Sequence, residues 1–268
     1  MQTHIFTYQQ ASLSYNRLGS GNQILLVFHG FGQNKSYFRH LAATLSTQYT
    51  VYTFDLFYHG QSVWPLPENP LTKTFWAEWL KAFLKQEQIE KFSLLGFSMG
   101  GKFVLATLES FSDRISKLIL IAPDGVKTSF WYSLATYPGW TSNYFRKMVT
   151  SPDAFSRLVG ICYKLRLVDK GIIRFAASQM DTPEKRRKVY NTWMLCRQLR
   201  FNMKHIAQLI NYHQIQVYIF LGSYDRIITR KNMLHLLKKL TKYELVMLQT
   251  GHNQLIDEVT KYMSANRI

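Results

Sequence analysis

Short apolar runs alternate with longer stretches of helical periodicity through most of this 268-residue chain. The runs are rich in branched and aromatic residues, and they predict strands at 24–28, 51–54, 92–97, 117–121, 217–221 and 244–248. Helical spacing of apolar positions follows or separates them at 36–45, 72–88 and 100–109, with Thr72 as a helix N-cap. Alternating polarity from Ile5 to Tyr15 predicts an antiparallel hairpin before the first of these strands. This order predicts an α/β protein with a mostly parallel sheet and helices on both faces.

The alternation of strands and helices breaks in the middle of the chain. From Gly125 to about Gln214 the sequence is aromatic and basic, has helical patterns and contains no strong strand run. Strands resume at Val217, so this segment interrupts a single sheet. We therefore predict a core domain made of residues 1–124 and 215–268, with a helical lid inserted at 125–214.

Composition narrows the class of protein. A chain with 47% hydrophobic, 15% aromatic and 18% charged residues is globular, because a disordered chain needs low hydrophobicity. No window approaches the ~20 apolar residues that span a bilayer, and the first ten residues lack the basic and apolar regions of a secretory signal. We expect a cytoplasmic protein without a transmembrane segment.

The two cysteines, Cys162 and Cys196, offer neither a disulfide framework nor the spacing of a metal site. We expect buried free thiols, and the sequence predicts no metal and no cofactor.

Positive charge is concentrated in the inserted segment. Residues 125–214 hold 15 Lys and Arg against 4 Asp and Glu, which is +11 of the chain's net +17, and the densest run is Lys185 to Lys188. Clustered positive potential attracts anionic substrates, membranes, acidic proteins or nucleic acid. A run of charges can equally be a solvated helix face, and both interpretations stay open.

The most informative motif is a Gly-x-Ser-x-Gly turn between a predicted strand and a predicted helix. It comprises Gly96, Ser98 and Gly100. The turn is sharp, so small residues are needed two positions before and after the serine, and the serine is lifted above the sheet edge at a helix N-terminus. This context favours Ser98 as a nucleophile.

The same run nearly matches a phosphate-binding loop, since Gly96, Gly101 and Lys102 have the spacing Gly-x-x-x-x-Gly-Lys. Such a loop needs Ser or Thr next to hold Mg²⁺, whereas Phe103 has no oxygen to offer. The sequence therefore disfavours nucleotide binding.

A serine that attacks a carbonyl needs backbone N–H donors for the developing oxyanion. Met99 follows the nucleophile, and Phe31 lies in the loop His29-Gly30-Phe31-Gly32 after a predicted strand. These two N–H groups are the predicted oxyanion hole. His29 is interpreted as a structural hydrogen-bonding residue.

Serine also needs a base, and the base needs a carboxylate that fixes its tautomer. His252 and Asp225 each follow a late predicted strand, so their side chains are expected at the same sheet edge as Ser98. Asp225 is the favoured acid, with Asp124 as the alternative because it too follows a strand. Asp55 and His59 precede the serine, and we expect them to organise their own loop.

With these residues assigned, the chain resembles the α/β-hydrolase superfamily over its length outside the insertion, and in particular its lid-bearing serine esterases. His-Gly-Phe-Gly at 29–32, Asp-x-x-x-His-Gly-x-Ser at 55–62, Gly-Phe-Ser-Met-Gly-Gly at 96–101, Asp225 and Gly251-His252 occur in the family's order. One departure is Phe57-Tyr58, where the family loop commonly carries Pro-Gly. The resemblance implies carboxylesterase, lipase, thioesterase or carbon–carbon bond hydrolase chemistry, or lyase chemistry with the same residues.

We therefore expect a serine hydrolase that cleaves a small-molecule carboxylic ester or thioester through an acyl-serine intermediate. The substrate can be anionic or carried by an acidic protein, and no nucleic-acid partner is expected. Aromatic residues at 130–145 can line an acyl pocket or pack the lid. The alternatives are a lyase or carbon–carbon bond hydrolase of the same fold, or a non-catalytic anion-binding scaffold.

Overall fold

The computed structural model describes residues 2–67, 69–128, 130–136, 140–151, 157, 160 and 177–266. The chain divides into two compact units. Unit 1 comprises Met1–Pro65, Thr72–Lys127 and Leu199–Ile268, and unit 2 comprises Leu66–Leu71 and Thr128–Gln198.

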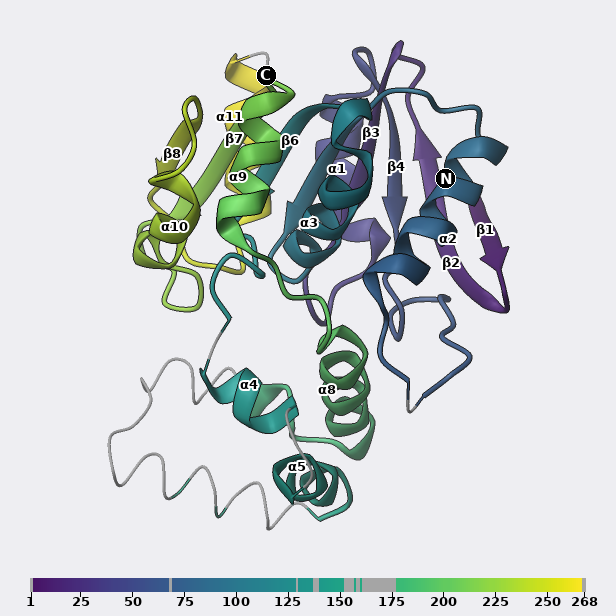
Figure 1. Ribbon diagram of the computed structural model, residues 1–268, viewed down its shortest axis with the longest axis vertical. Helices are drawn as coiled ribbons and strands as arrows, with labels where there is room; N and C mark the ends of the chain where they lie inside the picture. The colour runs from purple at the N-terminus through teal and green to yellow at the C-terminus, as the bar shows by residue number, and fades with distance from the viewer. Residues whose placement is uncertain are drawn as a thin grey trace. The chain divides into compact units, whose positions relative to one another are not determined.

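Unit 1 is built on an eight-stranded sheet with the strand order β1-β2-β4-β3-β5-β6-β7-β8 (Figure 1). The strands are β1 (Thr3–Tyr8), β2 (Ala11–Leu18), β3 (Gln23–Phe28), β4 (Tyr49–Phe54), β5 (Phe92–Phe97), β6 (Ile115–Ile121), β7 (Gln216–Gly222) and β8 (Glu244–Leu248). β2 is antiparallel to β1 and to β4, and the other neighbours are parallel. The predicted mostly parallel α/β sheet is confirmed.

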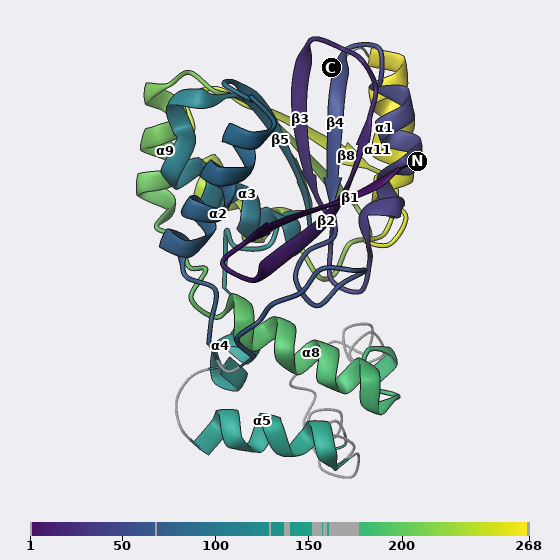
Figure 2. The same ribbon diagram turned by 90° about the vertical axis from the view of Figure 1, so that its right-hand side faces the viewer.

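Helices cover both faces of this sheet, as predicted. Figure 2 shows α2 (Lys73–Gln86), α3 (Gly100–Phe111) and α9 (Met203–Tyr212) on one face, and α1 (Arg39–Thr44) and α11 (Leu255–Asn266) on the other. α10 (Arg230–Leu237) packs against α9, a short 3₁₀ turn η1 (Lys35–Phe38) precedes α1, and another, η2 (Ser112–Arg114), follows α3. The parallel strands inside the sheet are therefore covered on both faces, which explains their continuous apolar character, whereas the edge strand β8 has no buried residue.

Helix α2 shows how the sequence determines its own packing. The Thr72 side chain accepts a hydrogen bond from the Phe75 N–H at 3.1 Å, which confirms the predicted N-cap. Trp76, Trp79 and Phe83 follow at helical spacing on one face, are fully buried, and stack ring on ring with centroids 5.6 and 5.8 Å apart. Burying this aromatic row anchors the helix to the sheet.

The C-terminal end of α2 is joined to two strands by a single carboxylate. Glu87 accepts hydrogen bonds from the hydroxyls of Tyr15 in β2 and Tyr52 in β4, at 2.9 and 3.0 Å. Burial, together with the Glu87 carboxylate, raises the pKa of Tyr52 to about 12 and raises the pKa of Tyr15 as well. Both phenols therefore stay protonated at neutral pH and keep donating to Glu87.

Replacing Glu87 with leucine is expected to lower the free energy of unfolding by about 1–3 kcal/mol, because two part-buried hydroxyls lose their acceptor. Chemical denaturation followed by fluorescence measures this loss. Glu90→Leu is the matched control, since the Glu90 residue is exposed and its expected change is within about 0.5 kcal/mol. Equal unfolding free energies for the two variants would contradict the bridging role.

Unit 2 contains the helices α4 (Phe130–Thr136), α5 (Trp140–Thr150) and α8 (Pro183–Cys196). Tyr132 and Phe145 pack against Trp193 with ring centroids 5.2 and 5.4 Å apart, and Phe145 also contacts Tyr190. Tyr132 and Phe145 thus pack the unit itself, while Tyr144 is 42% exposed. The side chains of Phe130, Trp131, Tyr137 and Trp140 lie outside the described residues.

The basic residues Lys185 to Lys188 differ in their exposure to solvent. Arg186 is buried and donates to the backbone carbonyls of Val149 and Met180, which fastens α8 within unit 2. Lys185 is exposed and pairs with Asp181 at 2.8 Å, and this hydrogen bond holds the pKa of Asp181 below its ordinary value. Arg186, one of these four basic residues, is therefore part of the packing of unit 2.

The helical lid predicted at 125–214 remains a prediction. Inside that range, α9 belongs to unit 1, where it packs against α3, and unit 2 ends at Gln198. Cys196 is a buried free thiol, as expected, and Cys162 lies outside the described residues. Within the described ranges, no helix has the length and apolar character that a bilayer crossing requires.

Candidate active site

Three side chains from separate loops meet at the carboxyl edge of the parallel strands. Ser98 follows β5, Asp225 lies three residues after β7, and His252 lies four residues after β8. The Ser98 Oγ is 3.1 Å from the His252 Nε2, and the His252 Nδ1 is 2.6 Å from the Asp225 Oδ2. An ionised carboxylate only accepts hydrogen bonds, so Nδ1 carries the proton and Nε2 is left to accept from the serine hydroxyl.

The turn that carries Ser98 is as tight as its glycines suggest. Ser98 adopts a left-handed φ of 49°, a strained conformation for a residue with a side chain. A Cβ at Gly96 would lie 2.9 Å from the Gly100 backbone, and a Cβ at Gly100 would lie 2.1 Å from the Phe28 carbonyl oxygen. Close approach of backbone thus requires both glycines, and it lifts the Ser98 side chain above the sheet.

The two candidate acids have different partners. Asp225, whose side chain is fully buried, accepts hydrogen bonds at Oδ1 from the backbone N–H groups of Ile227 and Ile228, at 2.8 and 3.0 Å. Its second oxygen is thereby directed at His252. Asp124 instead pairs with Lys102 at 3.5 Å and accepts from the Gly125 N–H. The structure brings Asp225 to His252 and gives Asp124 a different role.

The loop after β3 supplies the candidate oxyanion donor Phe31. The N–H groups on either side of it are engaged, because Gly30 donates to the Gln33 side chain at 3.1 Å and Gly32 donates to the His59 Nε2 at 3.1 Å. Met99 directly follows Ser98 and precedes α3, where the first N–H groups of a helix have no partner within it. A Cβ added at Gly30 would lie 3.2 Å from the Ser98 Cβ, so the loop that carries Phe31 lies beside the Ser98 turn.

A buried ion pair braces the loop at 55–62, as expected of Asp55. Its partner is Lys35, which the sequence does not predict, and the Lys35 backbone N–H and ammonium both donate to the Asp55 carboxylate at 2.7 Å. Lys35 also reaches the Ser14 hydroxyl. A lysine outside any motif gives no signal for this pairing. Tyr58 occupies the left-handed region at φ 63°, which is where the related family commonly has glycine.

A family model described as the alpha/beta hydrolase fold matches residues 23–259, a range that includes Ser98, Asp225 and His252. The chain belongs to the α/β-hydrolase fold family. Among curated proteins it is 31% identical over 122 residues to an uncharacterised protein of Mycobacterium bovis, which is 45% of this chain and 35% of that protein. It is 32% identical over 111 residues to the pimeloyl (acyl-carrier protein) methyl ester esterase of Aliivibrio salmonicida, covering 41% and 40% of the two chains. These matches span less than half the length of either relative.

Solved structures show the same fold. A thermophilic esterase from Thermogutta terrifontis superposes with a TM-score of 0.70 at 17% identity, covering all of this chain and 97% of the other. At this identity the likeness shows the fold alone.

The phosphate-loop alternative finds no support in this α/β-hydrolase. Phe103, at the position that would hold Mg²⁺, is buried and packs on the rings of Phe28 and Trp76. Lys102 is buried beside Asp124. In the described part of the chain, no group of three or more His, Cys, Asp or Glu side chains is arranged to hold a metal ion.

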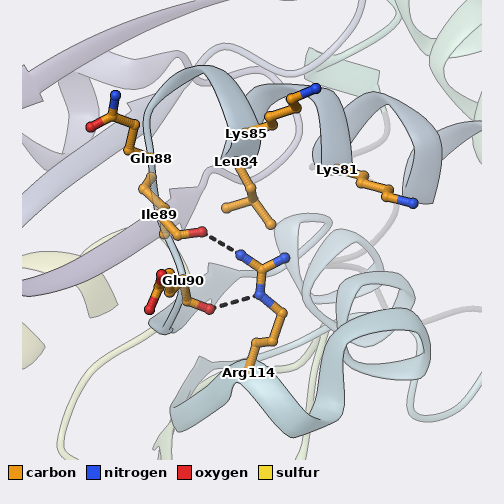
Figure 3. A pocket seen from close by; sticks show the side chains of 7 residues that line it. All are labelled: Lys81, Leu84, Lys85, Gln88, Ile89, Glu90 and Arg114. Atoms are coloured by element: carbon orange, nitrogen blue, oxygen red, sulfur yellow. Dashed lines mark hydrogen bonds between the residues drawn. The ribbon is translucent and has the colours of Figure 1, made fainter.

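A surface pocket of about 350 Å³ lies near the amino ends of β5 and β6, at the sheet edge opposite Ser98 (Figure 3). It is lined by residues from the end of α2, the turn before β5 and the turn before β6: Lys81, Leu84, Lys85, Gln88, Ile89, Glu90 and Arg114. Arg114 donates to the backbone carbonyls of Ile89 and Glu90. Its guanidinium therefore connects the turn before β6 to the turn before β5, away from the Ser98 site.

Proposed function

We propose that this protein is a serine hydrolase that cleaves carboxylic esters or thioesters through an acyl-serine intermediate. The observation that carries the proposal is the continuous hydrogen-bonded chain from Ser98 through His252 to Asp225 at the carboxyl edge of the sheet. A serine hydroxyl is a weak nucleophile, and an imidazole within hydrogen-bond reach removes its proton during attack. The α/β-hydrolase membership supports the same class of reaction.

In the proposed mechanism the Ser98 Oγ attacks the substrate carbonyl carbon, and its proton passes to the His252 Nε2. The carbonyl oxygen becomes an oxyanion, which accepts hydrogen bonds from the N–H groups of Phe31 and Met99. The imidazolium then gives its proton to the leaving alkoxide or thiolate, which leaves Ser98 acylated. A water molecule, deprotonated by His252, releases the acid in a second addition. Asp225 holds the imidazole in the required tautomer throughout.

The test of this proposal is turnover of p-nitrophenyl acetate and butyrate, combined with intact-mass measurement of the protein during the reaction. We expect release of p-nitrophenol and a population of protein heavier by one acyl group. A protein that hydrolyses neither these esters nor the corresponding acyl thioesters would contradict the proposal.

We further propose that the acyl group is anionic or carried by an anionic molecule. Two observations support this: the net charge of +11 over residues 125–214, and the similarity to an esterase whose name specifies an acyl-carrier-protein substrate. Clustered positive charge raises the association rate of anions at low salt.

Hydrolysis of a p-nitrophenyl monoester of a dicarboxylic acid is therefore expected to show a kcat/KM that falls several-fold between about 0.02 and 0.3 M salt, because salt screens the attraction. The uncharged monocarboxylic ester of equal length is the control, and its kcat/KM should change little. An identical salt response for the two esters would contradict anion selection.

A further inference from the structure

Two buried histidines outside the proposed catalytic set hydrogen-bond both loops beside the Ser98 turn. His29 lies directly after β3 and is fully buried, and His59 is 1% exposed in the loop after β4. Their rings lie 5.0 Å apart between centroids, and the ring of Phe31 meets His59 edge to face at 5.5 Å. The loop that carries Phe31 is therefore packed and hydrogen-bonded on these two imidazoles.

The partners of each ring fix its protonation. The His29 Nε2 faces the Leu56 N–H at 2.9 Å, and the His59 Nε2 faces the Gly32 N–H at 3.1 Å. A backbone N–H can only donate, so both Nε2 atoms carry no proton. The two Nδ1 atoms face the carbonyl oxygens of Gly30 and Phe57, at 2.7 and 3.0 Å, and a carbonyl can only accept. Both imidazoles are thus neutral, with the proton on Nδ1.

These bonds orient two consecutive peptide planes. The Gly30 carbonyl and the Phe31 N–H belong to one planar trans peptide, so they point in opposite directions. His29 fixes this plane through the carbonyl, and the Gln33 N–H adds a second bond to the same oxygen at 3.3 Å. His59 fixes the next plane through the Gly32 N–H. Both planes on either side of the Phe31 Cα are therefore locked.

We infer that His29 and His59 are positioning residues that aim the Phe31 N–H, His29 through the Gly30 carbonyl and His59 through the Gly32 N–H. This inference rests on the proposed function, because the aimed N–H is a proposed oxyanion donor. A donor aimed in advance stabilises the oxyanion at no cost in reorganisation, so its effect falls on the chemical step rather than on substrate binding.

The first test exchanges His59 for leucine, which has no acceptor, and for glutamine, whose amide oxygen replaces Nε2. For His59→Leu we expect kcat to fall about 10- to 100-fold with KM within about twofold, and the Ki of a trifluoromethyl ketone to rise by the factor that kcat/KM loses. This ketone adds Ser98 to form an anionic hemiketal, so its affinity reports the oxyanion site. His59→Gln should restore most of both quantities. His235→Leu, at an exposed position of α10, should change neither.

A His59→Leu variant with unchanged kcat and Ki, or one whose loss falls on KM alone, would overturn the inference. The second test needs no activity: ¹⁵N NMR of the histidine-labelled wild-type protein should identify His29 and His59 as neutral Nδ1–H tautomers. An Nε2–H tautomer or an imidazolium at either residue would overturn the inference even if every variant failed to fold. If the wild type hydrolysed no ester, the proposed function would fail, and the NMR result would still decide the hydrogen-bonding claim.

Discussion

Replacing Ser98 with alanine is expected to reduce kcat for p-nitrophenyl ester hydrolysis by about a millionfold, close to the uncatalysed rate plus any contribution from the oxyanion donors. Alanine removes the attacking oxygen, which is the hydroxyl that contacts the His252 Nε2 at 3.1 Å. KM for the ester should change little, because the substrate is held by groups other than the Ser98 Oγ.

The expected effect is specific to catalysis. Ser98 lies at φ 49°, and alanine has the same backbone preferences, so the Ser98→Ala variant should unfold within about 1 kcal/mol of the wild type. Denaturation of both proteins checks this point. A variant that folds normally and retains even one per cent of the wild-type kcat would remove Ser98 from its proposed role.

Asp225→Asn is expected to lower kcat by about 10⁴-fold with the fold intact. The N–H groups of Ile227 and Ile228 require an acceptor at the Oδ1 position, so the amide oxygen must stay there and the amide nitrogen must face His252. That nitrogen donates, so the facing Nδ1 has to become an acceptor. The imidazole proton then moves to Nε2, where it blocks acceptance of the Ser98 proton.

Asp124→Asn is the matched control, since Asp124 also follows a strand but contacts Lys102 and Gly125. Its kcat should stay within about tenfold of the wild type, because Asp124 makes no hydrogen bond to His252 in the described structure. Steady-state kinetics of the two variants decide between the acids. A larger loss for Asp124→Asn than for Asp225→Asn would reverse the assignment.

The parallel sheet was predictable because its strands are short apolar runs, and in the inner parallel strands most residues are buried. The predicted strand at 51–54 lengthens to Tyr49–Phe54 in the structure, where all six residues are buried beside β3. β2 continues to Leu18, beyond the predicted hairpin end at Tyr15, because Tyr15–Leu18 also pair with β4. Pairing with a strand distant in sequence leaves no periodic signal, so such extensions are found only in the fold.

Contacts between residues distant in sequence also explain which side-chain partners could not be predicted. Ser98 and His252 follow strands within recognisable turns, and their encounter follows from the edge that parallel strands share. Lys35, by contrast, contacts Asp55 across 20 residues, and Glu87 contacts Tyr15 across 72. Neither partner carries a local motif. In the sequence Arg186 is one of four consecutive basic residues, whereas its burial depends on backbone carbonyls of α5 and of the residues before α8.

Labelling with a fluorophosphonate probe, followed by peptide mass spectrometry, tests the central claim most directly, because the probe phosphonylates only a serine that a neighbouring base activates. We predict one phosphonyl group per protein, located at Ser98, in the native wild type and none after denaturation. A native protein that stays unlabelled, or is labelled at a residue other than Ser98, would contradict the account.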